Sequence, residues 1–132
     1  MFLTEDLKRQ IWNKCQISPL YDKEKVRKDS CGAWILYTEF GNSSSPFGWE
    51  IDHICPISKL RKYGIDFEKI DNIINLRALN IKNNRSKGDS YPVYTSTTTA
   101  VNDERNHDIE ETYVVNQVKQ NELSKFFSLD ND

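Results

Sequence analysis

The spacing of apolar residues along the chain predicts a small fold of mixed helices and strands. An apolar residue recurs at every fourth position between residues 7 and 15, and Thr4 stands where a helix-capping hydroxyl is expected. Two runs rich in β-forming residues, 31–40 and 47–54, predict strands. Alternation of apolar and polar residues over 73–79 predicts a third strand, so helix and strand patterns follow one another along the chain.

The remaining segments are shorter and more polar. Residues 80–87 predict a short polar helix, which Gly88 would end. A threonine-rich run over 93–101 predicts a further strand, and a weak helical periodicity over 109–127 predicts a final helix. We therefore expect an α+β fold class, with an N-terminal helix, an extra strand and a C-terminal extension.

Length and composition restrict the class of protein. A chain of 132 residues with 37% hydrophobic residues forms one small domain with a modest core. It contains no apolar run of about 18 residues and no secretory signal pattern at its start, so we expect no membrane association. Three cysteines without a C-x-x-C pair exclude a zinc site built on two such pairs and suit a reducing compartment. We expect an intracellular protein of the cytoplasm or nucleus, not a secreted one.

Charge is unevenly distributed on the two sides of Pro92. Residues 1–92 contain 15 basic and 12 acidic residues, whereas residues 93–132 contain three basic and eight acidic ones. The net charge of -2 therefore arises from the C-terminal segment rather than from the body of the chain. We divide the chain into a domain over 1–92 and a partly ordered acidic extension over 93–132, which we expect to dock a protein partner.

Candidate chemistry is concentrated between residues 49 and 88. Asp52 and His53 lie near the end of the second predicted strand. The third strand would bring Asn75 close to His53, and the polar helix would bring Asn84 over Asp52. One hard metal ion could then lie between Asp52 and Asn84, with His53 free beside it. Each of these residues is also a common structural residue, so the argument depends on their combination.

This combination resembles the HNH, or ββα-metal, endonuclease family. The family pattern is Asp-His-Ile-x-Pro-x-Ser, then a variable loop, Asn-Leu, an Asn nine residues after the first Asn, and x-x-Lys. The chain matches it at 52–58, at 75–76, at Asn84 and at Lys87. The resemblance covers roughly residues 10–92, and the last family letter is Asn instead of His, which makes this an HNN variant.

One departure from the family pattern concerns a structural zinc ion. Many family members hold that zinc with two cysteine pairs, but this chain has Asn80 and Asn83 at the later positions, and Cys31 is at best a remnant of the earlier pair. We therefore expect no structural zinc. The core would then be held by the packing of large apolar side chains such as Trp34, Phe40, Phe47, Trp49 and Leu76.

The resemblance implies metal-dependent hydrolysis of phosphodiester bonds in DNA. The implied catalytic residues are His53, which would take a proton from the attacking water, and Asn75, which would orient His53. Asp52 and Asn84 are the implied ligands of one Mg²⁺ or Mn²⁺ ion. The implied contacts to neighbouring phosphates come from two basic residues one helical turn away, Arg85 and Lys87.

Two other interpretations stay open. The chain could be a noncatalytic nucleic-acid-binding or structural subunit with an HNH fold, or a nuclease that works only within a larger assembly. It has no recognisable helix-turn-helix, so any sequence preference is weak or supplied by a partner. Free-standing proteins of this family and size serve phages, mobile elements, large viruses and restriction systems.

Overall fold

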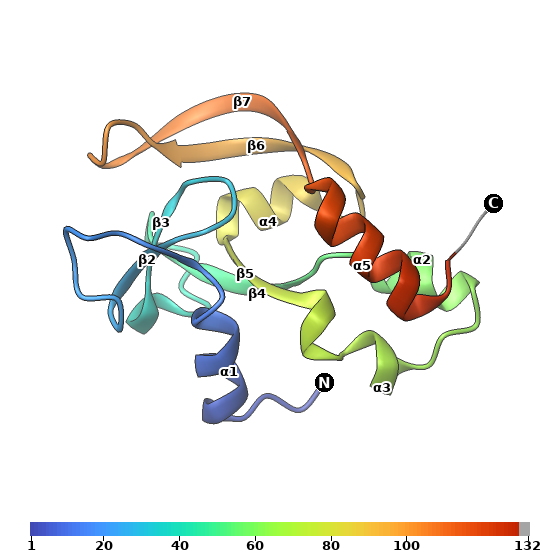
Figure 1. The fold of residues 1–132 in the computed structure, drawn as a ribbon. Coiled ribbons are helices and arrows are strands. Elements are labelled where there is room, and N and C mark those ends of the chain that lie inside the picture. The colour runs from blue at the N-terminus through green and yellow to red at the C-terminus, as the bar shows by residue number, and fades with distance from the viewer. Residues whose placement is uncertain (130–132) are drawn as a thin grey trace.

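The computed structural model describes residues 1–129, which form helices and three small antiparallel sheets (Figure 1). The helices are α1 (Glu5–Trp12), α2 (Ile57–Lys62), α3 (Phe67–Ile70), α4 (Ile81–Lys87) and α5 (Gln117–Phe127). The strands are β1 (Gln16–Ile17), β2 (Val26–Lys28), β3 (Trp34–Leu36), β4 (Trp49–His53), β5 (Leu76–Asn80), β6 (Val93–Ala100) and β7 (Asn106–Val114). Two 3-10 turns are η1 (Tyr37–Glu39) and η2 (Ile73–Asn75). The predicted α+β fold class is confirmed.

The N-terminal part contains the predicted helix and a shortened form of the strand predicted over 31–40, together with two short strands, β1 and β2, that were not predicted. The Thr4 hydroxyl accepts a hydrogen bond from the Leu7 amide at 3.0 Å and begins α1. The predicted strand over 31–40 is shorter, because the chain turns into η1 after Leu36. Strands β1, β2 and β3 make one antiparallel sheet beside α1 (Figure 1).

The central element is the hairpin of β4 and β5, followed directly by α4. In its register Asp52 lies opposite Arg77, and His53 lies opposite Leu76. Strand β5 starts at Leu76, later than predicted, because Asn72 caps a 3-10 turn by accepting a hydrogen bond from the Ile74 amide at 3.0 Å. Helix α4 ends at Gly88, whose φ of +52° suits a residue without a side chain.

A buried carboxylate joins this hairpin to the N-terminal sheet. Asp29 accepts hydrogen bonds from the backbone amides of Cys31, Ala33 and Asn80, each at 2.9 Å, and from the Asn83 side chain at 3.2 Å. Burial raises the pKa of this carboxyl, although the four N–H donors act in the opposite direction. The two asparagines at the family's zinc-cysteine positions therefore take part in a hydrogen-bonded network around Asp29.

Two hydrophobic clusters form the core. One contains Trp12, Trp49 and Leu76, between α1 and the central hairpin. Of the large side chains expected in the core, Trp34, Trp49 and Leu76 are buried, while Phe40 and Phe47 are only partly buried. The second cluster gathers residues from α2, α3, β6 and α5, namely Ile54, Cys55, Leu60, Ile70, Tyr94, Val115, Leu123 and Phe127.

The C-terminal segment consists of the β6–β7 hairpin and α5. The helix predicted over 109–127 is wrong in its first third, because β7 continues to Val114 and α5 begins only after Asn116, whose side chain accepts from the Lys119 amide at 2.8 Å. Residues between the strand predicted over 93–101 and the helix predicted over 109–127 form a hairpin turn running into β7, with positive φ at Asn102 and Asp103.

The segment 93–132 was predicted to be a separate extension, and the division at Pro92 stays a prediction. Figure 1 shows β6 and β7 lying along α4, and α5 descending towards α2. Leu123 and Phe127 of α5 pack in the same cluster as Leu60 and Ile70. The described part of the extension therefore shares a core with the body. Among the described residues, no helix is long and apolar enough to cross a membrane.

Candidate functional site

Three of the sequence-predicted residues meet at one hollow. Asp52, His53 and Asn84 line an open depression of about 180 Å³ at the end of β4. The remaining lining comes from β4, from the start of α2 and from the residues after α4, namely Ile51, Pro56, Ile57, Gly88 and Asp89. The hairpin supplies the first two residues and α4 supplies the third, so the order β4, β5, α4 builds this hollow.

His53 has a partner that the sequence did not indicate. Its Nε2 lies 2.7 Å from Oδ1 of Asp71, the residue that ends α3, and the two side chains are 17% and 19% exposed. A carboxylate only accepts hydrogen bonds, so this contact places the imidazole proton on Nε2. Nδ1 then keeps its lone pair, and it has no hydrogen-bond partner among the described residues.

Asp52 lies between two cations. Its Oδ2 is 2.9 Å from Nε of Arg77, and its Oδ1 is 3.1 Å from Nζ of Lys87. The side chain of Asp52 is 5% exposed, so water screens these pairs only weakly. Burial lowers the pKa of the Lys87 ammonium, and Asp52 counteracts this. For Arg77 burial also lowers the pKa, but Asp52 together with Tyr94 and Tyr113 outweighs it, so the pKa is raised.

The two residues expected to contact phosphates differ in position. Lys87 is 1% exposed, and its ammonium donates to the His53 carbonyl oxygen at 3.1 Å besides pairing with Asp52. In this arrangement it is turned inward, away from any phosphate, because its neighbours in α4 and β4 enclose it. Arg85 is 63% exposed and pairs with Glu50 at 3.4 Å, so it can still reach a phosphate on the surface.

Asn84 is oriented by Glu50, which shares a face of β4 with Asp52. The Asn84 side-chain amide donates to Glu50 Oε1 at 2.9 Å. The side-chain oxygen of Asn84, Oδ1, has no hydrogen-bond partner among residues 1–129. A free amide oxygen beside a carboxylate is a donor set that suits a hard divalent cation.

Asn75 acts on the backbone after His53 instead of on the imidazole ring. It is fully buried, accepts from the Cys55 amide at 2.8 Å, and donates to the carbonyl oxygens of Cys55 at 3.1 Å and Ile70 at 3.2 Å. The predicted contact with the His53 side chain is therefore absent from the described residues. Asn75 instead connects the end of β4 to α3, the helix that ends at Asp71.

Two residues of this site, Asp71 and Arg77, were not predicted from the sequence. Arg77 had a usable signal, because the alternation in the third predicted strand places its side chain on the face opposite Leu76 and Ala78. Asp71 had none, because its position depends on how the segment between β4 and β5 folds back.

Whether this site suits a metal ion is judged from the chemistry of its side chains. Asp52 and Asn84 offer oxygen ligands of the kind that Mg²⁺ and Mn²⁺ accept, and Mg²⁺ commonly uses one or two protein groups with water and phosphate. No group of three His, Cys, Asp or Glu side chains suited to a metal occurs among the described residues. The residues therefore fit an ion held partly by a substrate phosphate.

Comparison with known proteins does not assign the chain to a family. No protein-family model, no curated protein and no solved structure matches the chain.

Proposed function

We propose that this chain is a metal-dependent endonuclease of the HNH type, with a ββα-metal core that hydrolyses phosphodiester bonds in DNA. The proposal is carried by one observation: Asp52, His53 and Asn84 line the same hollow, while Asp71 fixes the His53 ring. Asp52, His53 and Asn84 are also among the residues that match the family pattern.

His53 is the general base. With its proton held on Nε2 by Asp71, Nδ1 can accept a proton from a water molecule that attacks phosphorus. When the imidazole takes this proton from water, it becomes a cation. The carboxylate of Asp71, 2.7 Å away, stabilises that cation. Asp71 therefore both orients the ring and favours its protonated form during the reaction. Asn75 supports this geometry indirectly, by fixing the backbone that follows His53.

Asp52 and Asn84 would hold the divalent cation. When bound, such an ion supplies Lewis-acid stabilisation of charge on phosphate oxygens. Each carboxylate oxygen has two lone pairs, so Asp52 can accept a further ligand while paired with Arg77 and Lys87. The two neighbouring cations oppose the ion, so we expect weak metal binding without substrate and tighter binding when a phosphate is present.

DNA contacts near this hollow would come first from Arg85. Its exposed guanidinium lies one residue beyond Asn84 and can reach a neighbouring phosphate. Lys87 would not contact DNA in this arrangement, and its contribution would be to hold the Asp52 carboxylate in place. The acidic extension would then serve protein partners rather than DNA, because its excess of carboxylates repels phosphates.

A plasmid-nicking assay tests the proposal. Supercoiled plasmid should be converted to open circles or linear DNA with Mg²⁺ or Mn²⁺, and chelation of the metal with EDTA should stop the reaction. The second candidate function, a noncatalytic nucleic-acid-binding subunit, predicts DNA binding without cleavage under every metal tried. The paired state of Asp52 is the observation that favours this alternative, because a carboxylate held by two cations is less available to a metal ion.

A further inference from the structure

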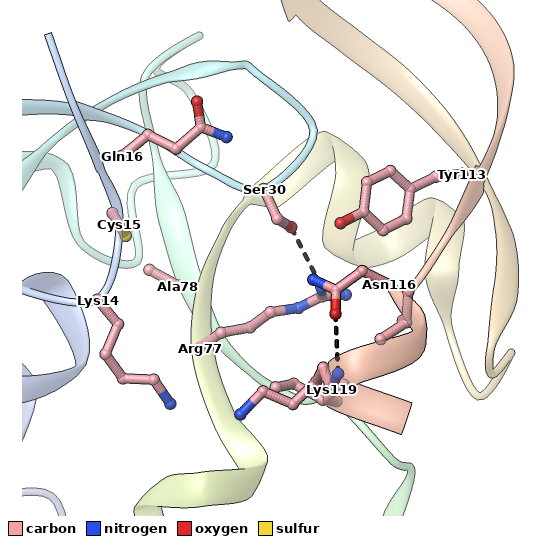
Figure 2. A pocket seen from close by; sticks show the side chains of 11 residues that line it. Lys14, Cys15, Gln16, Ser30, Arg77, Ala78, Tyr113, Asn116 and Lys119 are labelled. Atoms are coloured by element: carbon pink, nitrogen blue, oxygen red, sulfur yellow. Dashed lines mark hydrogen bonds between the residues drawn. The ribbon is translucent and has the colours of Figure 1, made fainter. Parts of the chain in front are cut away.

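A second and larger hollow lies beside β5, whereas the candidate active site is lined by β4. It has a volume of about 350 Å³, and its walls come from the end of α1, from β5, from β7 and from the start of α5. Figure 2 shows Lys14 and Lys119 extending into this space, while the side chain of Arg77 runs above both lysines towards Ser30. No carboxylate is among the residues that line it.

The two lysines bind the same turn of the backbone. Lys14 Nζ donates to the carbonyl oxygens of Ile73 at 2.7 Å and Leu76 at 2.5 Å. Lys119 Nζ donates to the carbonyl oxygen of Ile74 at 3.3 Å. Both ammonium groups are therefore drawn to η2 and held close to each other. An anion bound beside them would reduce their mutual repulsion.

The positive charge of this hollow is only partly neutralised. Glu122 pairs with Lys119 at 2.5 Å, and Asp52 pairs with Arg77 from the side of the other hollow. Lys14 has no ion pair among the described residues. Burial lowers the pKa of Lys14 to about 8, with Lys119 acting in the same direction and Glu122 opposing it.

Neutral hydrogen-bond donors complete the lining. The Tyr113 hydroxyl points into the space in Figure 2 and has no hydrogen-bond partner among residues 1–129. The Ser30 oxygen accepts from Arg77 Nη1 at 3.1 Å, so its own O–H can donate elsewhere. Ser30 and Tyr113 thus offer two hydroxyl donors beside three cations, an arrangement that matches a ligand with several acceptor oxygens.

We propose that this hollow binds a small phosphorylated ligand of about mononucleotide size. A phosphate monoester carries up to two negative charges, which would meet Lys14 and Lys119, while the two hydroxyls on the other side of Arg77 could donate to further acceptor oxygens of the ligand. The volume exceeds what a bare phosphate fills and falls in the range of small-molecule pockets. The apolar part of the wall, from Ala78 and Val115, would face the organic part of the ligand. This inference does not depend on the proposed nuclease activity.

The test is isothermal titration calorimetry on the full chain without added metal. The probes are inorganic phosphate, deoxyadenosine monophosphate and deoxyadenosine. We expect the monophosphate to bind more tightly than inorganic phosphate, and deoxyadenosine to give no measurable heat. Absence of binding by both phosphate probes, or equal binding by deoxyadenosine, would overturn the proposal.

Variants locate the binding. Lys119→Gln should weaken monophosphate binding at least about tenfold, and Tyr113→Phe should weaken it severalfold by removing the unpartnered hydroxyl. Lys25→Gln is the matched control, because Lys25 is exposed and lies outside the lining. Tyr113→Phe removes one oxygen atom, so it keeps the test valid even if Lys119→Gln fails to fold. Equal affinity in Tyr113→Phe, Lys25→Gln and the unmodified chain would contradict the assignment.

A last titration distinguishes binding of a small phosphorylated ligand from binding of nucleic acid. A short single-stranded oligonucleotide without terminal phosphates is titrated in the same way. If it binds in a manner sensitive to Tyr113→Phe while the monophosphate does not bind, the site reads a nucleic-acid backbone and the small-ligand proposal is overturned. Failure of plasmid cleavage with intact monophosphate binding would reject the proposed nuclease and leave this site standing.

Discussion

The imidazole of His53 and the carboxylate of Asp71 lie 2.7 Å apart, although the two residues are separated by 18 positions in the chain. The contact engages Nε2 and leaves Nδ1 of a side chain that lines the hollow shared with Asp52 and Asn84. It thereby supports the proposed role of His53 as general base, which the residues next to it in the sequence do not indicate.

Replacing Asp71 with asparagine should slow DNA cleavage about ten- to hundredfold, because the amide neither fixes the His53 tautomer nor stabilises an imidazolium. The measurement is the initial rate of plasmid nicking, with urea unfolding to check the fold. Glu68→Gln, an exposed change on the same short helix, is the control and should leave the rate unchanged. An Asp71→Asn protein that cleaves at the unmodified rate would remove Asp71 from the mechanism.

Removing the amide of Asn84 should raise the metal requirement of cleavage. In Asn84→Ala we expect the Mg²⁺ concentration for half-maximal nicking to increase about tenfold or more, because a metal ligand is lost. Asn121→Ala, an exposed asparagine on α5, serves as the control. The ligand assignment is incorrect if Asn84→Ala and Asn121→Ala need the same Mg²⁺ concentration.

Replacing Asp29 with alanine should destabilise the fold strongly. Four N–H groups that now bind its carboxylate would be left buried without an acceptor, and we expect a loss of about 3 kcal/mol or more in the free energy of unfolding. Urea denaturation measures this, with the exposed Glu110→Ala as the control. A change below about 1 kcal/mol would show that the network around Asp29 does not hold the hairpin in place.

The ammonium of Lys14 should titrate with a midpoint of about 8, well below the usual 10.5 for lysine. Between about pH 8 and 10.5 the unfolded chain binds more protons at Lys14 than the folded chain does. The contribution of Lys14 to the free energy of unfolding therefore increases as the pH rises from about 8 to 10.5, and this gain is lost as the pH falls back to about 8. Side-chain NMR, assigned with Lys14→Gln, gives the midpoint. Lys119→Gln should raise it, because one neighbouring positive charge disappears. An ordinary midpoint near 10.5 would contradict the burial of this group.

The parts of the fold that could be predicted are those fixed by local signals. Thr4 at the start of α1 and Gly88 at the end of α4 act within one turn of their own position, and the sequence contains everything they need. The boundary at Asn116 could not be found, because Tyr113 favours β7 through its contact with Tyr94, which lies far away in the chain.

The candidate site divides in the same way. Asp52, His53 and Asn84 could be named from spacing, and the structure does bring them to one hollow. The state of each group depends on tertiary contacts, such as Arg77 and Lys87 on Asp52, which no spacing rule specifies. Lys87 illustrates the limit, because a basic residue at the end of a polar helix is expected in water and is instead 1% exposed.

The most direct test of the account compares the unmodified chain with His53→Ala in the plasmid-nicking assay, with Mg²⁺ present and with Mg²⁺ chelated. We predict Mg²⁺-dependent nicking by the unmodified chain and a rate at least about a hundredfold lower for His53→Ala, whose urea midpoint should stay close to that of the unmodified chain. Nicking by folded His53→Ala at the unmodified rate, or no nicking by the unmodified chain with any divalent metal, would contradict the account.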